Sequence, residues 1–80
     1  VSMYIALLHT NDFENRDYTT QVIAVSTDMT KLQECGEQDA KANLDMALTW
    51  KTYGGGLESQ YMSFGNDKSM WYEIREVLCL

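Results

Sequence analysis

The residues best suited to chemistry in this chain are three consecutive glycines that follow a lysine and a threonine, in the stretch KTYGGG at 51–56. Phosphate-binding loops combine these residue types, but there the glycines come first and lead from a strand into a helix. Here the order is reversed, and the glycines follow a predicted helix. Glycine after the last turn supplies the left-handed residue that ends a helix. We therefore predict that this stretch ends the helix and binds no phosphate.

Candidate nucleophiles and metal ligands are few. His9 is the single histidine, and a thiol nucleophile at Cys35 would need it as a base. There is no C-x-x-C pair, so a zinc site built on nitrogen and sulfur ligands lacks its parts. The acidic loop at 12–17 lacks the glycine and terminal glutamate of an EF-hand. We expect no enzymatic activity, no cofactor and no metal, and we expect His9 to be a surface or hydrogen-bonded residue.

The composition indicates one small globular domain with an acidic surface. Of the 80 residues, 45% are apolar and 11% are aromatic, which is typical of a chain with a folded core. A domain of this size buries only about 60% of its unfolded surface and is marginally stable alone. The net charge of −6 opposes nonspecific nucleic-acid binding, which requires lysine and arginine. Solubility is the default interpretation of this charge, and a basic partner or mimicry of nucleic acid are the alternatives.

The start of the chain bears on its boundaries and compartment. Val1 and Ser2 are typical of a cloning scar ahead of Met3, so we assign residues 3–80 to one domain. With Met3 as the natural start there is no room for a signal peptide, and no apolar run approaches the ~18 residues of a membrane span. We expect a cytoplasmic protein. Cys35 and Cys79 are then reduced, buried thiols, with a disulfide between them as the alternative.

The remaining pattern predicts the fold class. The polar residues 10–17 predict a long hairpin loop between the first two strands. The strands are expected at residues 3–9, 18–25, 57–64 and 70–80. One long helix separates the two strand pairs, so the order is β-hairpin, helix, β-hairpin. This order predicts an α+β two-layer sandwich, in which the helix covers one face of a four-stranded, mostly antiparallel sheet.

The helix is predicted to start at residues 26–28 and to extend to about Thr52. Ser26, Thr27 and Asp28 can accept hydrogen bonds from the free N–H groups of a first turn. The helix has one irregularity, because its early apolar residues and those at 40–48 lie on different faces.

The two faces meet at Gly36, and glycine costs about 1 kcal/mol relative to alanine in a helix interior. This predicts a kink or break at residues 35–37. The alternative is a straight helix in which Asp39 and Asn43 form a buried polar pair.

One helix stripe packed on one sheet face would form the core, and two further apolar surfaces would then remain uncovered. One is a second helical stripe, formed by Ala42, Met46, Trp50 and Tyr53. The other is the far side of the last strand, where Trp71, Val77 and Cys79 lie if Tyr72, Ile74 and Leu78 face the helix. Interfaces are enriched in aromatic residues and methionine, so we expect these surfaces to bind a partner or a second copy. Burial by a wide helix face and a curved strand is the alternative. The candidate partner-binding residues are Met46, Trp50, Tyr53 and Trp71 as apolar anchors, and Asp12, Glu14 and Asp17 as acidic contacts.

The whole pattern resembles that of small bacteriophage-encoded proteins. These start with a short strand like residues 3–7 and an acidic hairpin, continue with a strand entering a helix as at 22–28, and end on an aromatic strand like 71–74. The chain is similar in size, acidity and lack of catalytic residues to phage inhibitors of host defence, anti-CRISPR proteins among them. The resemblance covers most of the chain, rests on pattern and carries over no functional residue.

The resemblance and the apolar surfaces together predict a non-enzymatic protein-binding module. It would be a phage or mobile-element inhibitor that occludes a basic surface of a host defence or nucleic-acid-binding protein, in the host cytoplasm. We expect no direct nucleic-acid binding and no membrane association. One alternative is a small oligomer that binds a nucleotide or other small molecule between subunits, with Lys51, Thr52 and the glycines lining the pocket. A structural or accessory protein without separable activity is another.

Overall fold

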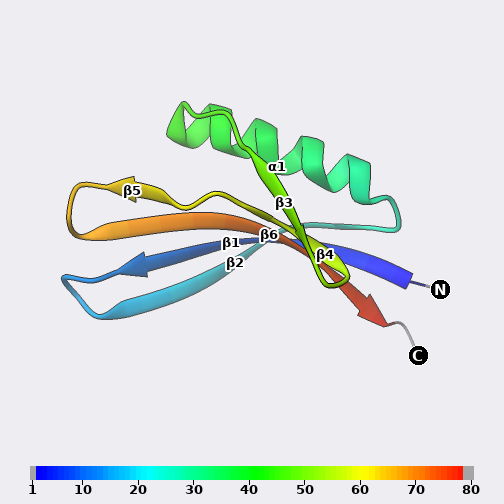
Figure 1. Cartoon of the computed structure of the whole chain (residues 1–80), viewed down its shortest axis with the longest axis horizontal. Helices are drawn as coiled ribbons and strands as arrows, with labels where there is room; N and C mark the ends of the chain where they lie inside the picture. The colour runs from blue at the N-terminus through cyan, green and yellow to red at the C-terminus, as the bar shows by residue number, and fades with distance from the viewer. Residues whose placement is uncertain (1, 79–80) are drawn as a thin grey trace.

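The computed structural model describes residues 2–78, which form one helix and a six-stranded sheet. Helix α1 lies along one face of the sheet (Figure 1). The α+β class and the mostly antiparallel sheet are confirmed, but the expected number of four strands is wrong. The elements are β1 (Ser2–Asp12), β2 (Asp17–Ser26), α1 (Met29–Leu44), β3 (Trp50–Tyr53), β4 (Gly56–Ser59), β5 (Met62–Phe64) and β6 (Lys68–Leu78). Cys79 and its predicted thiol or disulfide lie outside the described residues.

Strands β1 and β6 form the centre of the sheet. They pair antiparallel over their whole length, from Ser2 opposite Leu78 to Asp12 opposite Lys68. The strand order is β2-β1-β6-β4-β3, and β5 also pairs with β6. Residues 10–12, predicted to lie in a loop, instead continue β1, because β2 and β6 bind this segment from both sides. The turn between β1 and β2 is therefore confined to residues 13–16.

Strand β2 contains one extra residue relative to β1. Ala6 pairs with Ala24 and Leu7 with Val22, so Ile23 has no partner across the ladder. Ile23 and Ala24 both pack against the core beneath α1. Because of this bulge, the side chains of β2 before Ile23 alternate between the two sheet faces in step with those of β1.

Helix α1 begins as predicted and ends much earlier than predicted. The Asp28 carboxylate accepts a hydrogen bond from the Thr30 N–H at 2.9 Å, as an N-cap residue does. The helix ends at Leu44 because Asp45 adopts the left-handed conformation, and the Met46 N–H donates to the Ala40 carbonyl at 3.3 Å. The predicted extension to Thr52 is wrong, since an aspartate and not a glycine ends the helix.

The predicted break at residues 35–37 is also wrong, because α1 is continuous through Gly36. Gly36 is buried, and a Cβ there would lie 3.2 Å from the Trp50 ring. The glycine thus lets the helix approach β3, which offsets its poor helix propensity. Asp39 and Asn43 do pair, with the Asn43 amide donating to Asp39 at 3.0 Å, but Asn43 is exposed, so the pair is not buried.

The core lies between α1 and the central strands. Leu32 and Ala40 of the helix pack in clusters that include Ile74 and Tyr72 of β6, as predicted for these two strand residues. Burial raises the pKa of the Tyr72 hydroxyl, and its hydrogen bond to Asp39 raises it further. Leu78, expected on the same face, is exposed.

The KTYGGG stretch forms a β-hairpin and does not end the helix. Trp50 pairs with Ser59 and Tyr53 with Gly56, so residues 54 and 55 form the two-residue turn between β3 and β4. Gly54 has a φ of 48°, a left-handed value that glycine adopts readily. The β-favouring Trp, Thr and Tyr at 50–53 explain why this segment is a strand.

The strand predicted at 57–64 is divided into β4 and β5 by Gln60 and Tyr61. The Gln60 side chain accepts from the Thr49 N–H at 2.7 Å and donates to the Ala47 carbonyl at 3.2 Å. Gln60 therefore binds the segment that follows α1. This contact interrupts the pairing of residues 57–64 with β6.

Candidate functional site

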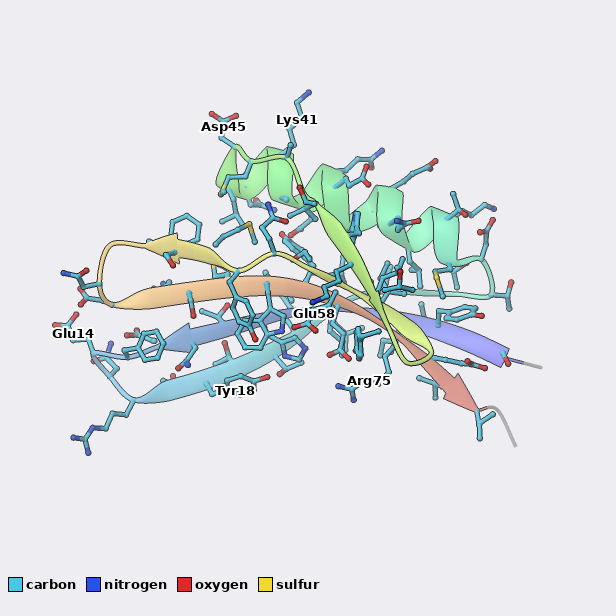
Figure 2. The ribbon with its side chains drawn as sticks, in the orientation of Figure 1. Glu14, Tyr18, Lys41, Asp45, Glu58 and Arg75 are labelled. Carbon is cyan, nitrogen blue, oxygen red and sulfur yellow. The ribbon has the colours of Figure 1, made fainter. Side chains whose placement is uncertain are left out.

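The face of the sheet opposite α1 carries a buried pair of polar residues, His9 of β1 and Glu73 of β6. Their exposed fractions are 5% and 7%. Their neighbours along each strand, Leu8 and Tyr72, pack beneath the helix, so alternation places His9 and Glu73 on the other side. We call this side the open face. Figure 2 shows Tyr18 and Arg75 on it, with Lys41 of α1 and Asp45, which follows the helix, at the opposite side.

The Glu73 carboxylate accepts hydrogen bonds from three side chains. His9 Nε2 lies 2.7 Å from Oε1, and the Arg75 guanidinium donates to both carboxylate oxygens at 3.0 Å. The Tyr53 hydroxyl, from the β3–β4 hairpin, donates to Oε2. Residues from three strands thus meet at one carboxylate.

These contacts keep Glu73 ionised. Burial alone would raise the pKa of its carboxyl, but hydrogen bonds from Arg75, Tyr53 and His9 outweigh burial and lower that pKa to about 2. Burial, together with the hydrogen bond to Glu73, raises the pKa of Tyr53 to about 12. The hydrogen bonds and charge of Glu73 likewise raise the pKa of Arg75. At neutral pH the site therefore holds a carboxylate, a neutral phenol and a guanidinium.

The other nitrogen of His9 faces β2. His9 Nδ1 lies 2.7 Å from the Tyr18 hydroxyl and 3.1 Å from the Thr20 hydroxyl. An ionised carboxylate can only accept, so the proton of a neutral His9 ring is on Nε2, towards Glu73. Nδ1 of that ring is then the acceptor, and Tyr18 donates to it.

Aromatic rings cover this polar pair. The Trp71 ring stacks on His9 with centroids 4.9 Å apart, and it lies 4.8 Å from Tyr61 and 5.9 Å from Tyr18. Tyr18 is 55% exposed and Tyr61 is 63% exposed. We call Tyr18, Tyr53, Tyr61 and Trp71 the aromatic surface. Its three tyrosines are exposed and Trp71 is half-buried, while His9 and Glu73, which hydrogen-bond Tyr18 and Tyr53, are buried.

Of the four predicted apolar anchors, two belong to this surface and two do not. Tyr53 and Trp71 lie on the open face, where Tyr53 hydrogen-bonds Glu73 and Trp71 stacks on His9. Trp50 lies on the other side of the sheet, next to Gly36, and its indole N–H donates to Glu37 at 3.0 Å. Met46 follows the helix and packs against the core. The predicted helical stripe through these residues does not exist, because residues 50–53 form a strand.

The three predicted acidic contacts lie at the β1–β2 hairpin. Asp12 and Asp17 pair at the ends of the two strands, and Glu14 is in the turn, far from Arg75 in Figure 2. The Asn15 side chain donates to Asp12 at 3.0 Å, which lowers the pKa of that carboxyl. The acidic residues therefore flank the aromatic surface beyond Tyr18 and do not enter it.

A pocket of about 380 Å³ lies between the β3–β4 hairpin and the loop that follows it. It is lined by residues 49–51 and 58–61. Lys51, predicted to line a nucleotide pocket, is among them, whereas Thr52 and the glycines are not. Within residues 2–78 we find no cluster of three or more histidine, cysteine or acidic side chains placed to hold a metal ion. The same residues contain no helix both long and apolar enough to cross a membrane.

The sequence predictions missed the His9–Glu73 pair, and they missed Tyr18. His9 and Glu73 are 64 residues apart, and only the register of β1 against β6 brings them together. One signal was present, because Glu73 and Arg75 interrupt apolar residues of β6 at every second position.

Comparison of the chain with protein families, with curated proteins and with solved structures found no match.

Proposed function

We propose that this protein is a non-enzymatic protein-binding module whose partner lies against the aromatic surface. The exposure of Tyr18 and Tyr61 beside the half-buried Trp71 carries this proposal. Tyrosine and tryptophan are the commonest residues of binding hot spots. His9 of the buried pair already holds Tyr18 by a hydrogen bond and Trp71 by stacking, so a partner would bind these two rings at a small cost in side-chain entropy. In this proposal helix and sheet form two layers, and the second sheet face is left for the partner.

The partner that fits this surface is a basic protein. The chain has a net charge of −6, and Asp12, Glu14 and Asp17 lie at the β1–β2 hairpin, beyond Tyr18 along the sheet. Opposite charge accelerates association and makes it sensitive to salt. We therefore propose a phage or mobile-element inhibitor in the host cytoplasm, which covers the basic surface of a defence or nucleic-acid-binding protein. Met46 and Trp50 have no part in this surface.

The test is capture from a bacterial lysate by the immobilised protein and two variants. Tyr61→Ala removes an exposed ring of the aromatic surface, and Leu78→Ala removes an exposed apolar side chain from the end of β6. We expect the wild type and Leu78→Ala to retain the same protein, and Tyr61→Ala to retain at least about tenfold less. Retention should weaken as salt is raised. Absence of a specific protein at low salt, or equal retention by Tyr61→Ala, would contradict the proposal.

A second proposal concerns self-association through β2. This ten-residue strand pairs only with β1, so one side of its backbone is an open edge. Proteins usually protect such edges with lysine, proline or short length. The other edge, β3, has four residues and contains Lys51, whereas β2 contains neither lysine nor proline. Because Asp17 is the one charged residue of β2, a second acidic copy can approach this edge without strong repulsion.

We expect light scattering over a dilution series to show a dimer that dissociates at low concentration. Val22→Lys, on the edge strand, should make the protein monomeric because an edge lysine opposes strand pairing. Val77→Lys is the matched control, an exposed valine of the central strand β6. A monomeric wild type, or equal loss of the dimer in both variants, would be evidence against pairing through β2.

A further inference from the structure

The Tyr18 hydroxyl is the end of a hydrogen-bonded chain that runs through His9 to Glu73. Tyr18 Oη lies 2.7 Å from His9 Nδ1, and His9 Nε2 lies 2.7 Å from Glu73 Oε1. A hydroxyl on a base that a third group orients is the arrangement of an activated nucleophile. We propose that Tyr18 is a nucleophile activated by His9, and that it accepts acyl groups from aryl esters.

The surroundings of His9 suit it to act as the base. Arg75 and Tyr53 hydrogen-bond Glu73 and keep the carboxylate in place beside Nε2. When Nδ1 takes the proton of Tyr18, the imidazolium forms next to an ionised carboxylate that stabilises its positive charge. Glu73 acts through His9 as a positioning residue and does not touch the substrate.

The position of Tyr18 allows a substrate to reach it. Its side chain is 55% exposed, whereas the base behind it is 5% exposed. The Trp71 ring, 5.9 Å from that of Tyr18, offers a surface for an aromatic leaving group. Thr20 also approaches Nδ1, at 3.1 Å, but an aliphatic hydroxyl is a much weaker acid than a phenol. Proton transfer therefore favours Tyr18.

The reaction is an acyl transfer without oxidation or reduction. A lone pair of Tyr18 Oη forms a bond to the ester carbonyl carbon, and the phenolic proton moves to His9 Nδ1. The bond from the carbonyl carbon to the leaving aryl oxygen breaks, and its electron pair leaves with the phenolate. His9 then releases the proton to water, and Tyr18 remains acylated, so each chain reacts once.

The test uses p-nitrophenyl acetate and compares two tyrosines of the same molecule. Tyr61 is the internal control, because it is 63% exposed and also contacts Trp71, but has no imidazole at its hydroxyl. We expect Tyr18 to be acetylated at least about tenfold faster than Tyr61, since a positioned base contributes 10²-fold or more. Mass spectrometry of digested protein measures both rates. Equal rates at the two tyrosines, or faster acetylation of Thr20, would overturn the proposal.

Two variants distinguish activation of the Tyr18 hydroxyl by His9 from reactivity that is due to solvent exposure alone. Tyr18→Phe removes the hydroxyl alone and should abolish the early release of p-nitrophenolate, with slow acetylation elsewhere unchanged. Thr20→Val removes the competing hydroxyl, and the acetyl group should still appear on Tyr18 in this variant. A fast release that persists in Tyr18→Phe would show that another residue is the nucleophile. Neither result depends on whether a protein partner binds the aromatic surface.

Discussion

Replacement of Glu73 with glutamine is expected to lower the free energy of unfolding by about 3 kcal/mol, because three donors, the buried His9 among them, lose the charged acceptor that they share. The isosteric amide keeps the volume of the side chain but presents an NH₂ group to His9, Tyr53 and Arg75, which all donate. A small domain has only about 5 kcal/mol of total stability at the low end of the usual range, so this loss is large. Urea denaturation measures it.

The matched control is Glu58→Gln. Glu58 lies opposite Glu73 in the β4–β6 ladder, on the same face, but is partly exposed. We expect its replacement to change the stability by less than about 0.5 kcal/mol, as is usual for residues near the surface. Equal effects of the two substitutions would show that the hydrogen bonds to Glu73 contribute little.

Glu73 also predicts how stability depends on acidity. The pKa of its carboxyl is about 2 in the folded protein, against an ordinary value of 4.5. The stabilising contribution is therefore complete above pH 4.5 and decreases as the pH falls from 4.5 towards 2, where Glu73 becomes protonated. Wild type and Glu73→Gln should differ most near neutral pH, and the difference should shrink across this window. A constant difference from neutral pH down to pH 2 would contradict this account.

Replacement of Gly56 with alanine is the second change with a large expected effect. A Cβ at Gly56 would overlap the backbone carbonyl oxygen of Ile74 in β6, and a backbone atom cannot rotate away. We expect a loss of about 3 kcal/mol, the upper end of the usual cost of overpacking. Thermal denaturation followed by circular dichroism measures it.

Alanine substitutions of the two preceding glycines, Gly54 and Gly55, are the controls for Gly56→Ala. A Cβ at Gly55 meets only the flexible Glu76 side chain at 3.3 Å, so Gly55→Ala should be almost neutral. Gly54 has open space around it but a φ of 48°, so alanine there should cost about 1 kcal/mol. Any order of effects other than Gly56, then Gly54, then Gly55 would argue against close packing of β4 on β6.

The sequence predicted correctly those features that depend only on neighbouring residues. The Asp28 cap, the apolar run of β1 and the inward-facing Tyr72 and Ile74 follow from capping chemistry and alternation, and the structure has all of them. The end of α1 was missed because Asp45 adopts the left-handed conformation that the prediction assigned to the glycines. The helix propensity of residues 46–48 then extended the prediction into β3.

The candidate site was less predictable than the fold, since its parts come from four strands. Tyr53 and Trp71 were predicted as binding residues because they are aromatic. In the structure they belong to one site because Tyr53 hydrogen-bonds Glu73 and Trp71 stacks on His9. Tyr18 and His9 reach each other through the β1–β2 pairing, where Thr20 lies directly opposite His9. That register depends on the bulge at Ile23, and no local pattern near residue 23 predicts a bulge.

The pairing of β1 with β6 makes the first and last elements of this region depend on each other during folding. Until residues 68–78 are present, β1 has only β2 as a neighbour, and β4 and β5 have no central strand to join. The two strands that form the middle of the sheet are the first and the last of the described elements, so they must find each other across all the elements between them. A nascent chain therefore cannot complete this sheet until β6 has left the ribosome.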